Sequence, residues 1–439
     1  MEPWVLLQEV AVPEPLCVTR TIDGVARTFA GDLRAGDLQG DGKLSFVVYR
    51  SLDCAHDEGG MKPCFMGAFD VSGQMLWHVG DGGEQPCRPG PVALFDLDGD
   101  GVDEILCFFL DATRSAPPDS LANVVMQIRS GRTGEVLRQA APPELRACAG
   151  RGPNWAHQRL LLANLRGLER PRDFVVKLGT VVLAFDEDLR VLWRYECPWE
   201  KYGNCPAYIP SVGDIDDDGR DEVNGGYYLL DHDGRVLWER AWAHHMDSVA
   251  ICPWDDGRMR AVGSGGGHVL DAAGNVVLCL GEGLVPHGQE VRIARFDPAD
   301  PEPQMAMRWN AHDPALLLAN TRGEVVARCT LNTSPNNTGM EAIFPDGPNG
   351  CAVLYNGGMV WDPLTGENWC LPGLPHPTPI GRMSWYHCIP VVLWHDGAEG
   401  IVLYNPWEPI VRVYGPASHA DRPPCFRPSP RQYNARLMD

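Results

Sequence analysis

Three segments of the chain repeat an acidic loop that runs into an apolar strand. In the clearest copies, oxygen-bearing side chains fall at loop positions 1, 3, 5 and 9, with glycine at position 6 for a tight bend. This layout suits a hard cation that takes about six to eight oxygen ligands, above all Ca²⁺. The candidate ligands are Asp96, Asp98, Asp100 and Glu104 in the second loop and Asp214, Asp216, Asp218 and Glu222 in the third.

The first acidic loop is the weakest copy. It has Asp37 and Asp41, but Gln39 and Ser45 stand where the other loops carry acids. We therefore expect it to bind a cation weakly or not at all. The alternative for all three loops is that they are turns between strands, because aspartate and glycine favour turns without any metal.

The acidic loops belong to a longer repeat of apolar strand, polar turn and apolar strand. Its copies span residues 68–77, 128–137, 184–193, 229–238, 269–278 and 318–326, with two weaker copies at 360–369 and 403–411. A short apolar run that could form an inner strand precedes each copy, at Arg34–Leu38, Val92–Leu97, Arg159–Leu165, Ser211–Ile215, Ser248–Cys252, Val291–Phe296, Met340–Phe344 and Ile389–Trp394. This repeat predicts an all-β, single-domain β-propeller with eight blades, or seven if the weaker copies do not count.

Both ends of the chain have a predicted place in this ring. The stretch Val5–Val12 alternates apolar and polar residues, so we expect it to supply a strand that closes the last blade. The propeller is predicted over residues 1–420. The tail over residues 421–439 is rich in proline and arginine and is expected to pack on the propeller.

Composition narrows the classes of partner. With 58 acidic and 37 basic residues the formal net charge is −21, which argues against nucleic acid because phosphate contacts need basic surfaces. No apolar run approaches the ~18–20 residues of a spanning helix, so no membrane association is expected. The 15 cysteines form no C-x-x-C pair, and no signal peptide is visible. A cytoplasmic protein is favoured, or a secreted one if a leader has been removed, acting as a monomer or small homo-oligomer.

Within this repeat, residues 172–328 resemble the catalytic propeller of the rhamnogalacturonan lyases, polysaccharide lyase family 11. The matching pieces are residues 172–177, 184–193, 210–223, 229–238, 245–251 and 287–298. The chain is shorter than a typical member and lacks several acidic loops after residue 223. Similar acidic loops also occur in non-enzymatic, integrin-type propellers. The resemblance implies β-elimination on an anionic poly- or oligosaccharide that contains uronic acid and rhamnose, with Ca²⁺ as cofactor.

Elimination across a uronic acid requires particular side chains. The C5 proton becomes acidic when a cation or arginine neutralises the carboxylate, a base must remove it, and an acid must protonate the leaving oxygen. We expect these groups just before the inner strands. The candidate catalytic residues are His287, Tyr208, His245, His157 and Arg88, and the candidate substrate-binding residues are Gln289, Asn336, Asn337, Tyr386, His387, Arg292 and Trp155.

Each candidate also has a purely structural interpretation. His287 could bond a neighbouring blade, and His245 with Asp247 could be a clamp between blades. Tyr208 and Tyr386 could be half-buried aromatic residues at strand ends. His244 and His312 could join a transition-metal site, but nothing in the sequence fixes the distance between them.

Two further functions stay open. A glycoside hydrolase needs two facing carboxylates about 5–9.5 Å apart. The acids available for this outside the loops are Glu290, Asp247, Asp313 and Glu341. A non-catalytic, Ca²⁺-stabilised carbohydrate-binding propeller is the other alternative.

Overall fold

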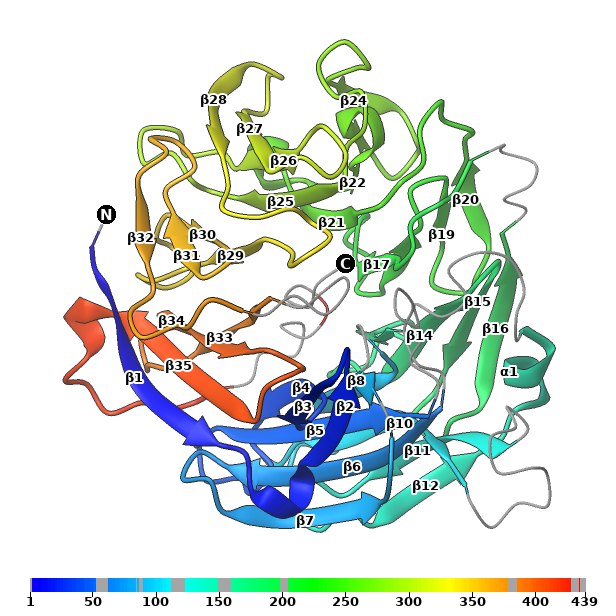
Figure 1. Ribbon diagram of the computed structural model, residues 1–439. Coiled ribbons are helices and arrows are strands. Elements are labelled where there is room, and N and C mark those ends of the chain that lie inside the picture. Colours follow the sequence, from blue (N-terminus) through cyan, green and yellow to red (C-terminus); the bar gives the residue numbers. More distant parts are fainter. Residues whose placement is uncertain are drawn as a thin grey trace.

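Short apolar strands separated by glycine- and aspartate-rich turns fold into antiparallel sheets that surround a common centre (Figure 1). The computed structural model describes residues 2–52, 62–83, 85–86, 90–111, 123–148, 159–197, 204–377, 385–427 and 434. Eight sheets, each with four strands in a row, form an eight-bladed β-propeller. This confirms the predicted fold and decides between seven and eight blades.

The strands of the first four blades follow one another along the chain. Blade 1 contains β4 (Asp32–Gly36), β5 (Ser45–Ser51), β6 (Pro63–Asp70) and β7 (Met75–Gly80), and β8 (Gln85–Pro86) pairs with β5. Blade 2 contains β9 (Val92–Phe95), β10 (Glu104–Leu110), β11 (Val124–Arg129) and β12 (Val136–Ala140). Blade 3 contains β13 (Leu160–Ala163), β14 (Asp173–Leu178), β15 (Val181–Phe185) and β16 (Val191–Glu196). Blade 4 contains β17 (Ser211–Gly213), β18 (Glu222–Asn224), β19 (Tyr228–Leu230) and β20 (Val236–Glu239).

The next three blades repeat the same order, and the eighth combines strands from both ends of the chain. Blade 5 contains β21 (Val249–Pro253), β22 (Met259–Gly263), β23 (His268–Leu270) and β24 (Val276–Cys279). Blade 6 contains β25 (Glu290–Ala294), β26 (Gln304–Arg308), β27 (Ala315–Ala319) and β28 (Val325–Thr330). Blade 7 contains β29 (Glu341–Ile343), β30 (Val353–Asn356), β31 (Met359–Trp361) and β32 (Asn368–Cys370). Blade 8 contains β33 (His387–Val392), β34 (Glu399–Tyr404), β35 (Ile410–Pro416) and β1 (Trp4–Ala11).

The first strand of each blade is the innermost, and each of the eight predicted inner strands overlaps one of them. Neighbouring inner strands contact one another from β4 through to β33. Because all of them run in the same direction through the ring, the molecule has two faces. We call the face on which the inner strands begin the front face and the face on which they end the back face.

The ring is closed by the N-terminal strand, as predicted. β1 pairs antiparallel with β35, with Trp4 opposite Pro416 and Ala11 opposite Ile410. A register shift between Leu6 and Gln8 lets the strand follow the twist of the blade. The first residues of the chain therefore complete the last blade.

Adjacent blades meet where an outer-strand tryptophan covers the hairpin glycine of the next blade. A Cβ atom added to Gly134 would lie 2.6 Å from the Trp77 ring, and one added to Gly274 would lie 2.8 Å from the Trp238 ring. Both glycines have positive φ angles, which residues with a Cβ rarely adopt. These tryptophans are buried between blades.

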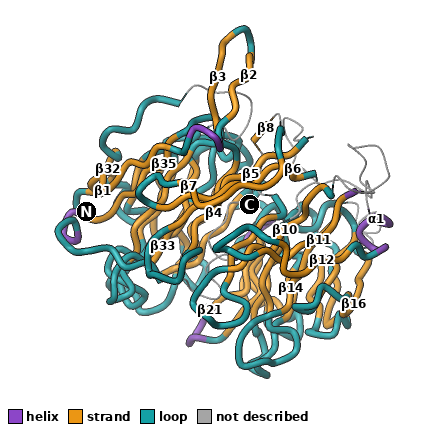
Figure 2. Tube along the Cα trace, turned by 90° about the horizontal axis from the view of Figure 1, so that it is seen from below, coloured by secondary structure: helices purple, strands orange, loops and turns teal. Residues whose placement is uncertain are grey.

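The remaining elements are small. A hairpin of β2 (Val18–Ile22) and β3 (Val25–Phe29) projects from the disc beside blade 1 (Figure 2). One α-helix, α1 (Pro143–Cys148), and 3₁₀ turns at Glu14–Leu16, Asp255–Gly257, Gly265–Gly267 and Ala417–His419 make up the described helical segments. None of the helices in the described ranges has the length and hydropathy needed to cross a bilayer.

Candidate functional site

The second acidic loop lies on the back face and brings carboxylates together. Donor oxygens of Asp96, Asp98 and Glu104 lie within 4.8 Å of one another. Burial is the main cause that raises the pKa of Glu104 to about 7. The Arg170 guanidinium donates to the Asp96 carbonyl at 2.7 Å and lies 3.2 Å from its carboxylate, so it already supplies one positive charge here.

The third loop offers the clearest place for a cation. Donor oxygens of Asp214, Asp216 and Asp218 converge within 4.8 Å. Glu222 is fully buried, and its Oε1 atom has no hydrogen-bond partner among the residues that the structure describes. Burial raises the pKa of Glu222 to about 8. A bound cation would satisfy this unpartnered oxygen, so these residues fit the predicted Ca²⁺.

Glu222 also lies near two residues of the following hairpin, Asp231 and His232. There, Arg235 pairs with Asp231, and Arg220 lies 2.7 Å from His232 Nε2. An imidazole nitrogen that accepts from arginine leaves the hydrogen on Nδ1, and this atom lies 2.7 Å from Asp231 Oδ1. His232 is therefore positioned as part of an ion-pair network.

In the first loop the acids bond to the loop itself. Oxygens of Asp37 accept the backbone N–H groups of Gln39, Gly40, Asp41 and Gly42. Asp41 pairs with Lys43 at 2.9 Å. Asp96 and Asp214 accept backbone N–H groups of their own loops in the same way. The weaker binding that we expect for the first loop therefore stays a prediction.

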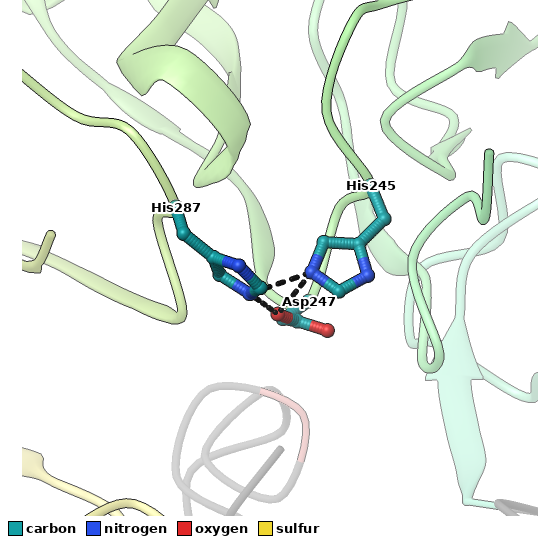
Figure 3. A group of neighbouring side chains, drawn as sticks. All are labelled: His245, Asp247 and His287. Atoms are coloured by element: carbon teal, nitrogen blue, oxygen red, sulfur yellow. Dashed lines mark hydrogen bonds and ion pairs between the residues drawn. The ribbon is translucent and has the colours of Figure 1, made fainter. Parts of the chain in front are cut away.

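A different cluster forms on the front face, where His245, Asp247 and His287 meet (Figure 3). The Nε2 atoms of the two histidines are 2.6 Å apart. Asp247 Oδ2 lies 3.2 Å from His245 Nε2 and 3.4 Å from His287 Nε2. The carboxylate is 3% exposed, whereas the imidazoles are 30% and 36% exposed, so the histidines face outward and the acid supports them from below.

Neighbouring backbone fixes this arrangement. His245 and Asp247 precede β21, and the Met246 N–H between them donates to the Cys205 carbonyl at 3.0 Å. His287 precedes β25, and its carbonyl accepts the Ala311 N–H at 2.8 Å. A Cβ on Gly265 would come within 2.6 Å of the His245 carbonyl, so only glycine leaves room there.

The electrostatics of the cluster favour a protonated His245 beside an ionised Asp247. The hydrogen bond that His245 donates to Asp247 is the main cause that raises the pKa of His245. Burial pushes the pKa of Asp247 upward, but hydrogen bonds from both histidines outweigh it and hold that pKa below its usual value. Two imidazoles and a carboxylate can exchange a proton with a substrate, or they can ligate a divalent metal ion.

The sequence identified the two histidines but not the way they join. His245 and His287 come from loops of neighbouring blades, and the shared contact with Asp247 appears only in the folded ring. The available signal was the His-x-Asp spacing at 245–247.

Two further candidates lie inside blade 8. Tyr386 is 1% exposed, and its hydroxyl lies 3.1 Å from both carboxylate oxygens of Glu408. Burial raises its pKa well above the usual value. His387 is 3% exposed and packs against Tyr404, with ring centres 5.2 Å apart. Both side chains are thus engaged within the protein.

The other candidates are placed as follows. Arg292 pairs with Glu341 at 3.3 Å, so its charge is already balanced. Gln289 is half-buried, and its Oε1 has no hydrogen-bond partner. Asn336 and Asn337 are half-buried in one turn, where Asn337 donates to Thr333. Tyr208 is half-buried. Arg88, Trp155 and His157 lie outside the described residues.

The acids considered for hydrolysis are also engaged. Glu290 pairs with Arg308 at 2.8 Å in the core. Glu341 pairs with Arg292, and Asp313 accepts the Asn310 amide at 2.5 Å.

The two curated relatives of the chain are both rhamnogalacturonan lyases. The chain matches no family model. It is 29% identical over 269 residues to rhamnogalacturonan exolyase YesX of Bacillus subtilis strain 168, a match that covers 51% of this chain and 42% of that protein. It is 25% identical over 267 residues to rhamnogalacturonan endolyase YesW of the same strain, covering 52% and 42%. The match thus spans less than half the length of these curated relatives.

Solved structures show the same fold. A Bacillus licheniformis rhamnogalacturonan lyase of family PL11 superposes with a TM-score of 0.67 at 22% identity, covering 93% of this chain and 75% of that one. The YesW crystal structure superposes with a TM-score of 0.68 at 20% identity and the same coverage. The biofilm matrix protein Bap1 of Vibrio cholerae gives 0.58 at 12% identity, covering 100% and 96%. In sequence and fold, the chain is a rhamnogalacturonan lyase-like β-propeller.

Proposed function

We propose that the protein is a polysaccharide lyase that cleaves a glycan containing uronic acid and rhamnose by β-elimination. The similarity to an exolyase and an endolyase for rhamnogalacturonan supports this class of reaction. The observation that carries the proposal is the cluster of His245, Asp247 and His287, which gathers proton-exchanging groups on the front face.

In the proposed reaction, His287 removes the C5 proton of the uronic acid through its Nε2 atom. The electron pair of that C–H bond forms the C4–C5 double bond, and the bond from C4 to the glycosidic oxygen breaks. A proton must reach the leaving oxygen, and Tyr208 is the candidate donor. Asp247 stabilises the imidazolium that forms, because its buried carboxylate contacts both imidazoles.

The same three side chains could hold a divalent cation. Two imidazoles and one carboxylate suit zinc, manganese or iron more than the all-oxygen set that Ca²⁺ prefers. When bound, such a cation would neutralise the uronate carboxylate and make the C5 proton more acidic. The imidazole nitrogens that hold it could not then accept that proton, so a metal site here is an alternative to His287 as the base. Ca²⁺ would instead occupy the acidic loops on the back face, foremost the third loop.

Elimination is favoured over hydrolysis because two of the acids considered for hydrolysis are held in ion pairs. Glu290 and Glu341 are paired with arginines, so neither is available as a carboxylate that faces the glycan.

The test is ultraviolet absorbance during incubation with rhamnogalacturonan, since each cleavage creates a C4–C5 double bond. We expect absorbance to rise with the wild-type protein and to fall at least about 100-fold in rate with His287→Ala. His78→Ala, an exposed histidine on β7, is the matched control and should retain full activity. Reducing ends without absorbance would mean hydrolysis, and glycan binding without either product would mean a carbohydrate-binding propeller.

A further inference from the structure

The C-terminal tail is attached to the propeller near the centre of the ring. On the back face, the Cys425 N–H donates to the Leu393 carbonyl at 2.6 Å, and the Arg427 N–H donates to the Val392 carbonyl at 3.1 Å. Val392 is the last residue of the inner strand β33. The tail therefore bonds to the chain where the inner strand of blade 8 ends.

Phe426 anchors this first attachment. It is 5% exposed and belongs to the hydrophobic core between blades 8 and 1. Its N–H donates to the Gly42 carbonyl in the first acidic loop at 2.8 Å. Burial of this apolar side chain favours the contact and keeps the start of the tail in place.

The second attachment is made by Asn434 on a different blade. Its side-chain Oδ1 accepts the Leu162 N–H at 2.9 Å, and its Nδ2 donates to the Leu162 carbonyl. The Arg159 guanidinium donates to the Asn434 carbonyl at 2.8 Å. Leu162 lies in β13, the inner strand of blade 3, and Arg159 precedes that strand toward the front face.

The Asn434 amide acts here as a neighbouring strand would. In the described sheet β13 pairs with β14 along one edge, and its other edge faces the centre of the ring. A main-chain N–H and carbonyl on that edge need partners. The amide of Asn434 supplies both an acceptor and a donor to the same residue, so it occupies the inner edge of blade 3.

We propose that Asn434 is a built-in occupant of the inner edge of β13, where it competes with the glycan. A sugar hydroxyl donates and accepts hydrogen bonds as the Asn434 amide does, so the two can replace each other on Leu162. The competition rests on the proposed function, whereas the docking of Asn434 does not.

Hydrogen exchange of the Leu162 amide tests the docking in the full-length chain. In Asn434→Ala this amide loses its acceptor, so we expect its exchange to quicken at least about 10-fold. Asn434→Asp keeps an acceptor but loses the donor. Its exchange rate at Leu162 should lie between the rates of the wild-type chain and Asn434→Ala. Asn368→Ala on β32 is the control, because that exposed side chain bonds only weakly, at 3.4 Å, to Gly366. Unchanged exchange at Leu162 in Asn434→Ala would overturn the docking.

Calorimetric titration with rhamnogalacturonan fragments tests the competition. Asn434→Ala should bind them several-fold more tightly than the wild-type chain, with an unchanged lyase rate at saturation. Equal or weaker binding by Asn434→Ala, with wild-type lyase activity intact, would overturn the competition and leave the proposed function standing. If neither the wild-type chain nor Asn434→Ala binds the fragments or shows lyase activity, the result would count against the proposed function and against the competition. Hydrogen exchange at Leu162 would still decide whether Asn434 docks.

Discussion

The Nε2 atoms of His245 and His287 lie 2.6 Å apart although the residues are 42 positions apart in the sequence. Only one hydrogen fits between two nitrogens at this distance, and two imidazolium ions there would repel each other. The pair therefore holds one shared proton more readily than two, and Asp247 beside both rings stabilises the singly charged state.

Asp247→Asn should shift the pH dependence of the reaction. The hydrogen bond that His245 donates to Asp247 raises the pKa of His245, so loss of the carboxylate lowers that pKa. If the histidine pair must be neutral to accept a proton, the acid limb of the pH–rate profile moves to lower pH, with a rate about 10–100-fold lower at the optimum. An unmoved limb would show that Asp247 does not set the protonation of the pair.

Removal of calcium should destabilise the protein through the third acidic loop. A cation bound only to the folded chain raises the melting temperature by mass action, so chelation should lower it. Glu222→Gln should remove much of this difference, because it alters the buried carboxylate whose Oε1 has no partner. Asp41→Asn is the control, since Asp41 already pairs with Lys43. A chelator effect of full size in Glu222→Gln would exclude the third loop as its source.

Asp103 should make stability fall as pH rises toward neutrality. Its carboxylate is 2% exposed, with Oδ1 unpartnered and Oδ2 accepting the Asp37 N–H at 2.7 Å. Burial raises its pKa from 3.8 to about 7, so the folded chain holds this proton more tightly than the unfolded chain. The stability it contributes is present at low pH and is lost between about pH 4 and 7.

Asp103→Asn should therefore flatten this part of the stability curve, measured by urea unfolding with chelator present. The amide oxygen can still accept the Asp37 N–H, so the contact between blades remains. Glu104 and Glu222, whose pKa values are also raised by burial, should leave a smaller slope of the same sign. If the stability of Asp103→Asn fell with pH as steeply as that of the wild type, Asp103 would not be the source of the pH dependence.

Breaking the pair of Glu290 and Arg308 should be costly. Both side chains are buried, and the guanidinium lies 2.8 Å from the carboxylate. Arg308→Met leaves the carboxylate without its cation, which destabilises by about 3–5 kcal/mol in comparable cases. The double change Glu290→Gln with Arg308→Met should cost less than Arg308→Met alone, as measured by urea unfolding. A larger loss in the double variant would mean that packing, not charge, sets the cost.

The repeat made the blades predictable from the sequence. Each hairpin begins with a buried strand and turns through glycine or aspartate, and these signals are local. The closing strand was visible in the alternation over Val5–Val12, which became β1. Counting the copies left eight blades or seven, and the sheets of the folded chain decide for eight.

The partners of the candidate side chains were not predictable in the same way. Arg292 meets Glu341 from the next blade, 49 positions away. His387 lies in β33, where the first five residues are all buried, so no alternation indicates which way its side chain points. The convergence of His245 with His287, and the contact of Asn434 with Leu162, likewise depend on how separate blades close around one centre.

The pairing of β1 with β35 also has a consequence during synthesis. The first strand leaves the ribosome long before the last three, so it must remain without its sheet until almost the whole polypeptide exists. Blades 1 to 7 can pack together while blade 8 is incomplete. At that stage blade 8 lacks β1 if this strand has not yet docked, or β33, β34 and β35 if they have not yet been made. Completion of the ring thus waits until β35 has been made, and a polypeptide interrupted before β33 would expose the apolar side of blade 7 to any other unfinished molecule.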